Sequence, residues 1–289
     1  MGYRLAAWPR AFKFIGDSHG ARFDGLVFLD EGDPPRYVIT QAHNHYGFRS
    51  TEFSYDDGTL NARLVSSLLT LNILRGTREN AIPALGRFRT ARDPLGWEFG
   101  LRLRQSYRNE LLVISCGEVD ARDIIRRLPL DARIAMSRPM PVFPDDPPAG
   151  TETITEAELA EEIESEYLTP LFRGMRTLVD IGIANLFLLA LPPPGLNDAD
   201  YAEHCGFMSR RHVRYAVHLT INALFEKFCN ANNVGYIDTW PHVTTPDGAL
   251  LPHFGTDSVH LNRDAALAIV AELGRRTAND PIPTLDPLI

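Results

Sequence analysis

The chain has 289 residues, of which 44% are hydrophobic and 23% are charged, and its formal net charge at pH 7 is −8. This composition is typical of a folded globular protein and not of a disordered or fibrous one. The excess of negative charge argues against nucleic-acid binding, because nucleic-acid-binding proteins gain affinity by neutralising phosphates.

We expect the protein to be cytoplasmic and not to insert into a membrane. No uninterrupted apolar run approaches the ~18 residues that a membrane helix requires. Arginine and proline near the N-terminus interrupt the apolar stretch that a signal peptide needs. The cysteines are widely spaced and form no CxxC pair, which predicts free thiols in a reducing compartment. They are Cys116, Cys205 and Cys229.

Predicted strands and helices alternate along the chain. Short apolar runs bounded by turn residues predict strands at residues 11–15, 37–40, 111–115, 186–191 and 234–237. Apolar residues at helical spacing predict helices at residues 60–74, 156–181, 210–231 and 264–275. This order predicts an α/β fold with a mainly parallel sheet that is covered on both faces. We expect one domain over residues 1–289, with irregular insertions near residues 76–100 and 139–150.

Polar residues at helix starts predict where three of these helices begin. Thr155 followed by Glu158 predicts a capping box for the helix at 156–181. Ser209 and Asn262 are the predicted N-caps of the last two helices.

Four polar segments lie at places where a ligand site is expected. They are residues 16–20, 117–122, 192–195 and 257–260. Three of them follow predicted strands and the last precedes the final helix. Ligands of open α/β sheets bind beyond the carboxyl ends of the strands, so these segments contain the candidate site residues.

Ser18, His260 and Asp257 have the residue types of a serine nucleophile and its activating pair. Ser18 follows the first strand between Gly16 and Gly20, whose small size permits a tight turn that exposes a side chain and a backbone N–H together. Serine at its ordinary pKa is a poor nucleophile and needs a base. His260 is the candidate base, and Asp257, three residues earlier, is placed to hold one imidazole nitrogen and direct the other to Ser18.

Gly16-Asp17-Ser18 after the first strand and Asp257-x-x-His260 before the last helix together resemble the SGNH/GDSL hydrolases. The resemblance spans nearly the whole chain, since its two anchors lie at opposite ends. It implies a flavodoxin-like three-layer α/β/α sandwich and ester hydrolysis without a metal or other cofactor. It also implies that Ser18 is the nucleophile, His260 the base and Asp257 the carboxylate that orients the base.

The chain departs from that family at the groups that bind the oxyanion. The third family block is Gly-x-Asn-Asp, whereas residues 117–120 read Gly-Glu-Val-Asp, so valine stands at the position of the donor asparagine. We expect the Gly117 N–H to contribute, Gly47 to match the glycine of the second block, and Asn44 to replace the missing amide. Arg122 is expected to neutralise Glu118 or Asp120, or to face the substrate. Together with Gly-Asp-Ser-His, this Gly-Glu-x-Asp-x-Arg segment is similar to a variant branch of the family.

Other arrangements of the same residues are weaker candidates. His19, His43 and His45 are possible metal ligands, but zinc needs at least three protein ligands in a geometry that nothing in the sequence sets, so we predict no metal site. Glu118 and Asp120 resemble the acid pair of a glycosidase; we interpret them as structural acids on a loop. We expect Cys116 to be a buried thiol at a strand end and not a nucleophile.

The sequence therefore predicts a metal-independent serine esterase that acts on a small-molecule or carbohydrate ester. Two alternatives stay open. One is a non-catalytic ligand-binding or regulatory protein on the same fold, which Val119 at the oxyanion position favours. The other is an acyltransferase that uses the same three residues and excludes water from the acyl-enzyme.

Overall fold

A computed structural model describes most of the protein. The described residues are 10–30, 36–45, 47–75, 102–103, 110–141, 143, 153–183, 185–246, 248–257 and 259–277. The predicted insertion at residues 76–100 lies outside the described residues, and so does most of the one at residues 139–150.

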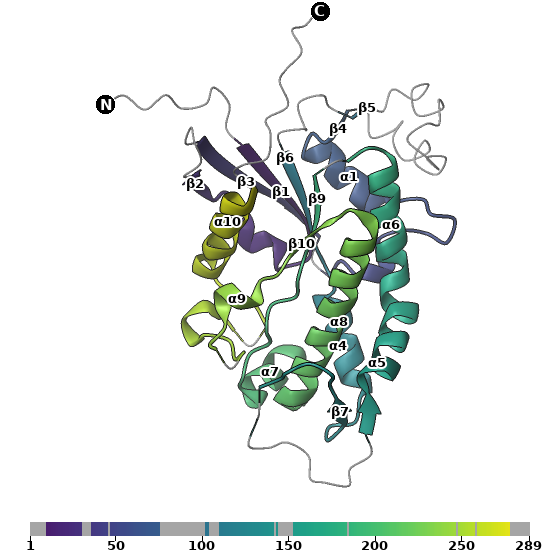
Figure 1. Cartoon of the computed structure of the whole chain (residues 1–289), viewed down its shortest axis with the longest axis vertical. Helices are drawn as coiled ribbons and strands as arrows, with labels where there is room; N and C mark the ends of the chain where they lie inside the picture. The colour runs from purple at the N-terminus through teal and green to yellow at the C-terminus, as the bar shows by residue number, and fades with distance from the viewer. Residues whose placement is uncertain are drawn as a thin grey trace, which may run out of the picture.

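The centre of the molecule is a six-stranded sheet with the order β10-β9-β6-β1-β3-β2 (Figure 1). Its strands are β1 (Arg10–Gly16), β2 (Val27–Asp30), β3 (Arg36–Asn44), β6 (Glu110–Ser115), β9 (Leu186–Leu189) and β10 (Gly235–Ile237). All neighbouring strands pair in parallel except β2, which pairs antiparallel with β3 at one edge. Two small two-stranded ladders join β4 (Leu74–Arg75) to β5 (Arg102–Leu103) and β7 (Arg133–Ala135) to β8 (Thr153–Thr155).

The parallel strands, taken in chain order, lie in the spatial order 2-1-3-4-5, which is the flavodoxin-like order. The predicted fold class is therefore confirmed, and every predicted strand is present. Strand β2 was not predicted from the sequence. It lies at the edge of the sheet, and Val27 in it is 61% exposed, so its apolar residues do not form the buried run that marks a central strand.

Helices cover both faces of the sheet and make three layers (Figure 1). One core packs strand side chains against α1 (Ala62–Thr70), α4 (Glu118–Arg127), α5 (Glu156–Ile163), α6 (Thr169–Asp180) and α8 (Arg211–Asn232). The opposite core packs them against α9 (Trp240–Val243) and α10 (Arg263–Thr277). Neighbouring residues of one strand divide between the two cores, as Leu111 and Leu112 of β6 do. Each central strand is thus buried on both faces, which explains its continuous apolar sequence.

The remaining helical segments are short or interrupt longer helices. They are α7 (Asp198–Cys205), a π-helical turn η4 (Glu164–Leu168) between α5 and α6, and the 3-10 turns η1 (Gly20–Phe23), η2 (Ser50–Glu52) and η5 (Pro252–Phe254). Among the described residues, no helix has the length and hydropathy needed to cross a membrane.

Two of the predicted helix caps are confirmed and one is wrong. Thr155 and Glu158 form the predicted capping box, and Asn262 Oδ1 accepts the backbone N–H of Ala265 at 3.0 Å. Ser209 does not cap α8, because the helix begins one residue later than expected and Arg210 occupies the N-cap position without a side-chain bond.

Gly16 allows β1 to approach β6 closely at the end of the strand. It is in register with Ser115, and a Cβ added to Gly16 would lie 1.7 Å from the Ser115 carbonyl oxygen. Gly16→Ala is therefore expected to push the two central strands apart. It should lower the free energy of unfolding by about 1–3 kcal/mol, the usual cost of overpacking, or by more.

Urea unfolding checks this prediction, with Gly255→Ala as the matched control. A Cβ at Gly255 would meet its nearest neighbour at an ordinary distance of 3.5 Å. Equal unfolding midpoints for the two variants would contradict the close approach of β1 and β6.

Candidate active site

A tight turn after β1 exposes Ser18 at the carboxyl edge of the sheet. The Asp17 N–H donates to the Ser115 carbonyl at 3.0 Å, and Asp17 Oδ1 accepts the His19 N–H at 3.0 Å. The Gly20 N–H then bonds to the Asp17 carbonyl at 3.1 Å and starts η1. Asp17 thus stabilises the turn through backbone hydrogen bonds. The turn lies where β1 has its neighbours β6 and β3 on opposite sides, at the point where the strand order reverses and α/β proteins bind ligands.

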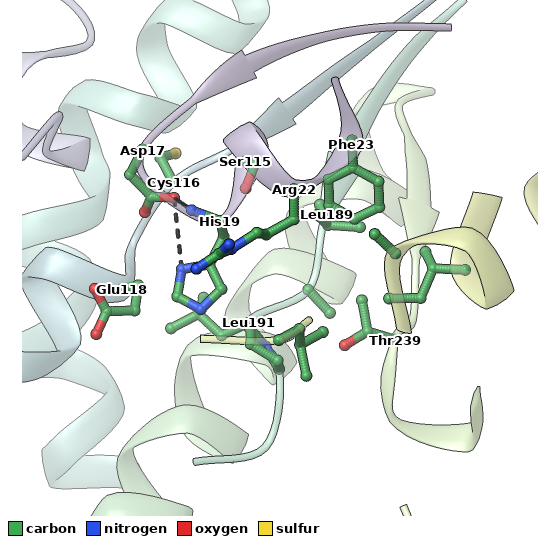
Figure 2. Close-up of a pocket in the computed structure, with 15 residues that line it drawn as sticks. Asp17, His19, Arg22, Phe23, Ser115, Cys116, Glu118, Leu189, Leu191 and Thr239 are labelled. Atoms are coloured by element: carbon green, nitrogen blue, oxygen red, sulfur yellow. Dashed lines mark hydrogen bonds and ion pairs between the residues drawn. The ribbon is translucent and has the colours of Figure 1, made fainter. Parts of the chain in front are cut away.

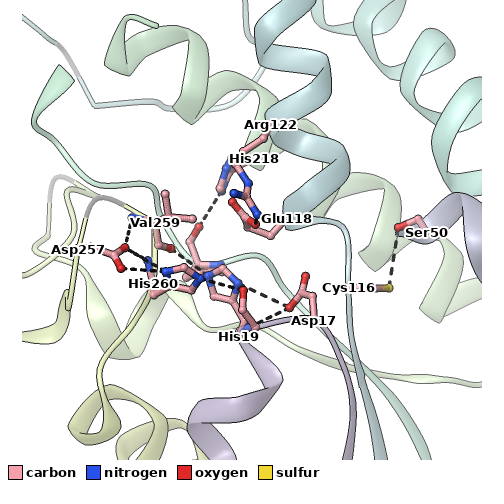
Figure 3. A network of polar contacts seen from close by, with 12 residues as sticks. Asp17, His19, Ser50, Cys116, Glu118, Arg122, His218, Asp257, Val259 and His260 are labelled. Atoms are coloured by element: carbon pink, nitrogen blue, oxygen red, sulfur yellow. Dashed lines mark hydrogen bonds and ion pairs between the residues drawn. The ribbon is translucent and has the colours of Figure 1, made fainter. Parts of the chain in front are cut away.

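Ser18, His260 and Asp257 lie in a hydrogen-bonded chain, of which Figure 3 labels Asp257 and His260. Ser18 Oγ is 2.8 Å from His260 Nε2, although the two residues are 242 positions apart. His260 Nδ1 is 2.9 Å from Asp257 Oδ2 and 3.1 Å from Asp257 Oδ1. The bond to the carboxylate places the proton on Nδ1 and leaves the Nε2 lone pair to accept the Ser18 proton. All three residues are half-buried, so Ser18 and His260 are within reach of a ligand.

Asp257 also organises the loop that carries the imidazole. Its Oδ1 accepts the backbone N–H groups of Val259 at 2.8 Å and His260 at 2.7 Å. Burial raises the pKa of the Asp257 carboxyl, but these N–H groups and the His260 ring outweigh burial, so the pKa is lowered. The pKa of His260 is lowered first by burial and then by the neighbouring His19. At neutral pH the carboxylate is ionised and His260 is a free base, the states that a base-activated nucleophile needs.

Glu118 and Asp120 lie in the first turn of α4, which corrects the prediction that they are on a loop. The helix begins directly after Gly117, whose φ of 108° only glycine adopts readily, and glycine at that position gave no side-chain signal of a helix start. Arg122 Nη2 donates to Glu118 Oε2 at 2.6 Å, while Asp120 Oδ2 accepts the Ser50 N–H at 2.7 Å. Each acid therefore has its own partner, and the two do not form an open pair that flanks a ligand.

Burial controls the charge of these two acids. It raises the pKa of Glu118 to about 7, although His19 and Arg122 act in the opposite direction. It raises the pKa of Asp120 to about 6, against the lowering effect of the bond from Ser50. Arg122 pairs with Glu118 and not with Asp120, and the alternative that Arg122 faces the substrate stays a prediction.

The raised pKa of Glu118 predicts how stability depends on pH. Between the ordinary pKa of about 4.5 and the folded-state pKa of about 7, the native protein binds more protons than the unfolded chain. Stability is therefore lost as pH rises through this range. Glu118→Gln keeps an acceptor for Arg122 without a charge, and it is expected to remove about 3 kcal/mol of this loss. Urea unfolding from about pH 4.5 to pH 8 measures it, and parallel curves for the variant and the wild type would contradict it.

The other predicted site residues are Asn44, Gly117 and Gly47, and each has a different environment. Asn44 ends β3 in register with Gly16, and its Oδ1 is buried 2.7 Å from where a Gly20 Cβ would be. Gly117 is buried against Leu191 and Phe225 at the end of β6. Gly47 is exposed in a turn with a φ of 72° and has open space around it. The structure thus places Asn44 against the nucleophile loop, whereas it gives Gly47 no such packing.

His43 and His45 are held together and apart from His19. His43 Nδ1 and His45 Nε2 lie 2.9 Å and 2.7 Å from Ser67 Oγ, which itself donates to the Arg63 carbonyl. His19 Nε2 instead bonds to the Val259 carbonyl. The three histidines that were considered as metal ligands therefore do not converge.

Backbone carbonyls of the segment at residues 192–195 accept hydrogen bonds from buried side chains of α8. The Pro192 carbonyl accepts from His218 Nδ1 at 2.8 Å, and the Gly195 carbonyl accepts from the buried Arg214 at 2.9 Å.

Cys116 is buried at the end of β6, and burial raises its pKa well above the ordinary value, which does not suit a nucleophile. Cys205 and Cys229 are free thiols, as expected.

A small cavity lies beside Asp17 and His19, the chain neighbours of Ser18 (Figure 2). Asp17, His19 and Glu118 line one part of it, and Leu189 and Ile269 line another. Its volume of about 20 Å³ is room for about one water molecule. Ser18 is not among the residues that line it.

His204 and His19 both lie next to the ring of His260, a position that the sequence did not predict for either residue. The ring of His204, on α7, lies 5.4 Å from that of His260 in an edge-on arrangement, and the ring of His19 lies 5.1 Å from it. The signal for His19 was its position directly after Ser18. His204 gave no signal, because α7 was not predicted.

Comparison with known proteins finds likenesses of structure only. No family model matches the chain, and no curated protein matches it. A carbohydrate acetylesterase from Sinorhizobium meliloti matches with 12% identity and a TM-score of 0.43, over 93% of this chain and 98% of that chain. An extracellular lipase from Streptomyces rimosus matches with 11% identity and a TM-score of 0.44, over 93% of this chain and 100% of that one. A lipase/acylhydrolase from Enterococcus faecalis matches with 13% identity and a TM-score of 0.40, over 96% of this chain and 100% of that one. Such likenesses concern the fold, and the chemistry has to be inferred from the residues around Ser18.

Proposed function

We propose that the protein is a metal-independent serine hydrolase of carboxylic esters. The observation that carries the proposal is the 2.8 Å contact between Ser18 Oγ and His260 Nε2, with Asp257 on the other ring nitrogen at 2.9 Å. A serine on a turn at the carboxyl edge of the sheet, bonded to a free-base imidazole that a carboxylate orients, is an activated nucleophile.

The reaction would proceed through an acyl-enzyme. Ser18 Oγ attacks the ester carbonyl carbon while His260 Nε2 accepts the hydroxyl proton, and Asp257 stabilises the resulting imidazolium. His260 then returns this proton to the leaving alcohol. A water molecule, deprotonated by His260, attacks the acyl-enzyme, and the acid is released when Ser18 recovers its proton.

The oxyanion would be bound by groups around the Ser18 turn. The Ser18 N–H donates to no other described group, so it is available to the developing negative charge. We assign a second donor to the amide of Asn44, whose side chain lies against the same turn, and a third to the Gly117 N–H. This assignment supplies an amide donor although Val119 stands at the asparagine position of the family block.

Asn44→Ala is expected to lower kcat for a p-nitrophenyl ester about 10²- to 10³-fold, because loss of one oxyanion donor has that effect. KM should change little, since the donor acts on charge that develops in the transition state. Steady-state kinetics checks this, with Asn232→Ala as the control because Asn232 bonds to Arg176 and the Phe228 carbonyl, away from this turn. An unchanged kcat in Asn44→Ala would remove Asn44 from the oxyanion site.

The substrate is proposed to be a small-molecule or carbohydrate ester. The cavity lined by Asp17 and His19 has a volume of about 20 Å³, which is less than a long acyl chain needs. The exposed His204 lies beside the ring of His260 and offers a polar contact to such a substrate.

Stoichiometric labelling with a fluorophosphonate tests the proposed function without knowledge of the natural substrate. The wild type is expected to be labelled once, and Ser18→Ala and His260→Ala are expected not to be labelled. Ser165→Ala is the matched control, because Ser165 is exposed on η4 and should leave labelling intact. Failure to label folded wild-type protein would contradict the proposal and favour a ligand-binding role on the same fold.

A further inference from the structure

A second histidine is buried beneath the Ser18–His260 pair. His19 is 5% exposed, and its Nε2 lies 2.9 Å from the carbonyl oxygen of Val259. A carbonyl oxygen can only accept, so His19 Nε2 carries a proton and donates it. His19 directly follows Ser18, and Val259 directly precedes His260, so this hydrogen bond joins the two loops that carry the reacting atoms (Figure 3).

The other ring nitrogen of His19 faces acidic groups. His19 Nδ1 is 3.7 Å from Asp17 Oδ1, and polar atoms of Asp17, His19 and Glu118 all lie within 4.8 Å of one another. All three side chains are more than nine-tenths buried. Among the described residues, neither His19 Nδ1 nor Asp17 Oδ2 has a hydrogen-bond partner. A lone pair on Nδ1 would face the Asp17 carboxylate at low dielectric, and Glu118 as well once it ionises near pH 7, whereas a proton there makes the ring a cation beside them.

Charged and titratable groups from several elements surround the two rings. Around His19 they are Asp17 of its own loop, Arg22 of η1 across the shared cavity, Cys116 after β6, Glu118 of α4 with Arg122 bound to it, and His218 of α8; around His260 they are His19, Asp257 and His204 of α7. Burial lowers the pKa of His19, but Asp17, Glu118 and the Val259 carbonyl outweigh burial, so the pKa is raised. The same positive charge lowers the pKa of His260.

We propose that His19 is a positioning residue that, as an imidazolium held by Asp17 and Glu118, clamps the His260 loop to the Ser18 loop and keeps His260 a free base. The catalytic meaning of this role rests on the proposed function. The clamp maintains the distance from Ser18 Oγ to His260 Nε2. The charge disfavours protonation of His260, whose ring centroid is 5.1 Å from that of His19.

Three variants separate the clamp from the charge. His19→Gln keeps an N–H group near the position of Nε2 and removes the charge, whereas His19→Leu removes both. His212→Gln is the matched control, because His212 is also buried and its Nε2 also lies against a backbone carbonyl, that of Ala132, at 3.1 Å.

NMR titration of the His260 ring, assigned with His260→Ala, is the first readout because it needs no turnover. In His19→Gln the His260 ring is expected to titrate at a higher pH than in the wild type, and in His212→Gln at the same pH. An unchanged titration in His19→Gln would overturn the proposal. One equivalent of divalent metal in purified wild-type protein that is absent from His19→Gln would also overturn it, because His19 Nδ1 would then be a ligand and not protonated.

The pH dependence of the fluorophosphonate labelling rate is the second readout. His19→Gln should keep the plateau rate, with the acid limb moved to higher pH. His19→Leu should lose about 10²-fold of the plateau rate, the effect of an ångström-scale misplacement of a reacting group. A wild-type plateau in His19→Leu would overturn the clamp. If the wild type is not labelled at any pH but the His260 titration shifts as expected, the proposed function fails and the charge of His19 beside His260 is supported.

Discussion

Replacing Ser18 by alanine is expected to lower kcat for hydrolysis of a p-nitrophenyl ester about 10⁴- to 10⁶-fold, the range seen when a triad nucleophile is removed. No other described hydroxyl is bonded to His260 Nε2, so none replaces Ser18 as the attacking group. Binding and oxyanion stabilisation would remain and leave a small residual rate above that in water. Steady-state kinetics and single-turnover measurements check the result.

The loss should occur in a folded protein. Ser18 is half-buried, and its side chain bonds only to His260 among the described residues. Ser18→Ala should therefore unfold in urea at nearly the wild-type midpoint. A Ser18→Ala protein that retains kcat would contradict Ser18 as the nucleophile, whereas a shifted midpoint would assign the residue a structural role.

Asp257→Asn is expected to lower kcat about 10⁴-fold, through the tautomer of His260. The asparagine Oδ1 can still accept the backbone N–H groups of Val259 and His260, so the loop is retained. The Nδ2 amino group would instead face His260 Nδ1 and make that nitrogen an acceptor. The ring proton then moves to Nε2, which donates to Ser18 and cannot accept its proton.

Asp238→Asn is the matched control for this substitution. Asp238 Oδ1 accepts the backbone N–H of Trp240 at 3.1 Å in the same kind of turn, but its carboxylate is bonded to no histidine. It should keep the wild-type kcat. Equal activity of Asp257→Asn and the wild type would contradict the orienting role, and the double variant with Ser18→Ala should be no slower than Ser18→Ala alone, because the residues act as a unit.

Much of the architecture follows from local sequence patterns. The central strands are apolar on both faces, so residues 111–115 and 186–191 read as buried strands without knowledge of their neighbours. The long helices have their own periodicity, and Thr155 with Glu158 encodes one helix start within four residues. Ser18 and the Asp257–His260 pair were found because each is a short, contiguous segment next to a predicted element.

Other features depend on groups that are distant in the chain, so local sequence patterns do not predict these features. Helix α4 follows a left-handed glycine, so its start shows no capping side chain, and the raised pKa of Glu118 arises only from the burial that α4 acquires in the fold. Strand β2 exists because β3 offers it an edge. The bond from His19 to the Val259 carbonyl spans 240 residues, and the charge of His19 arises only when folding buries it between two carboxylates. Sequence thus specified the elements and the reactive side chains, while burial and long-range hydrogen bonds set their charges and mutual distances.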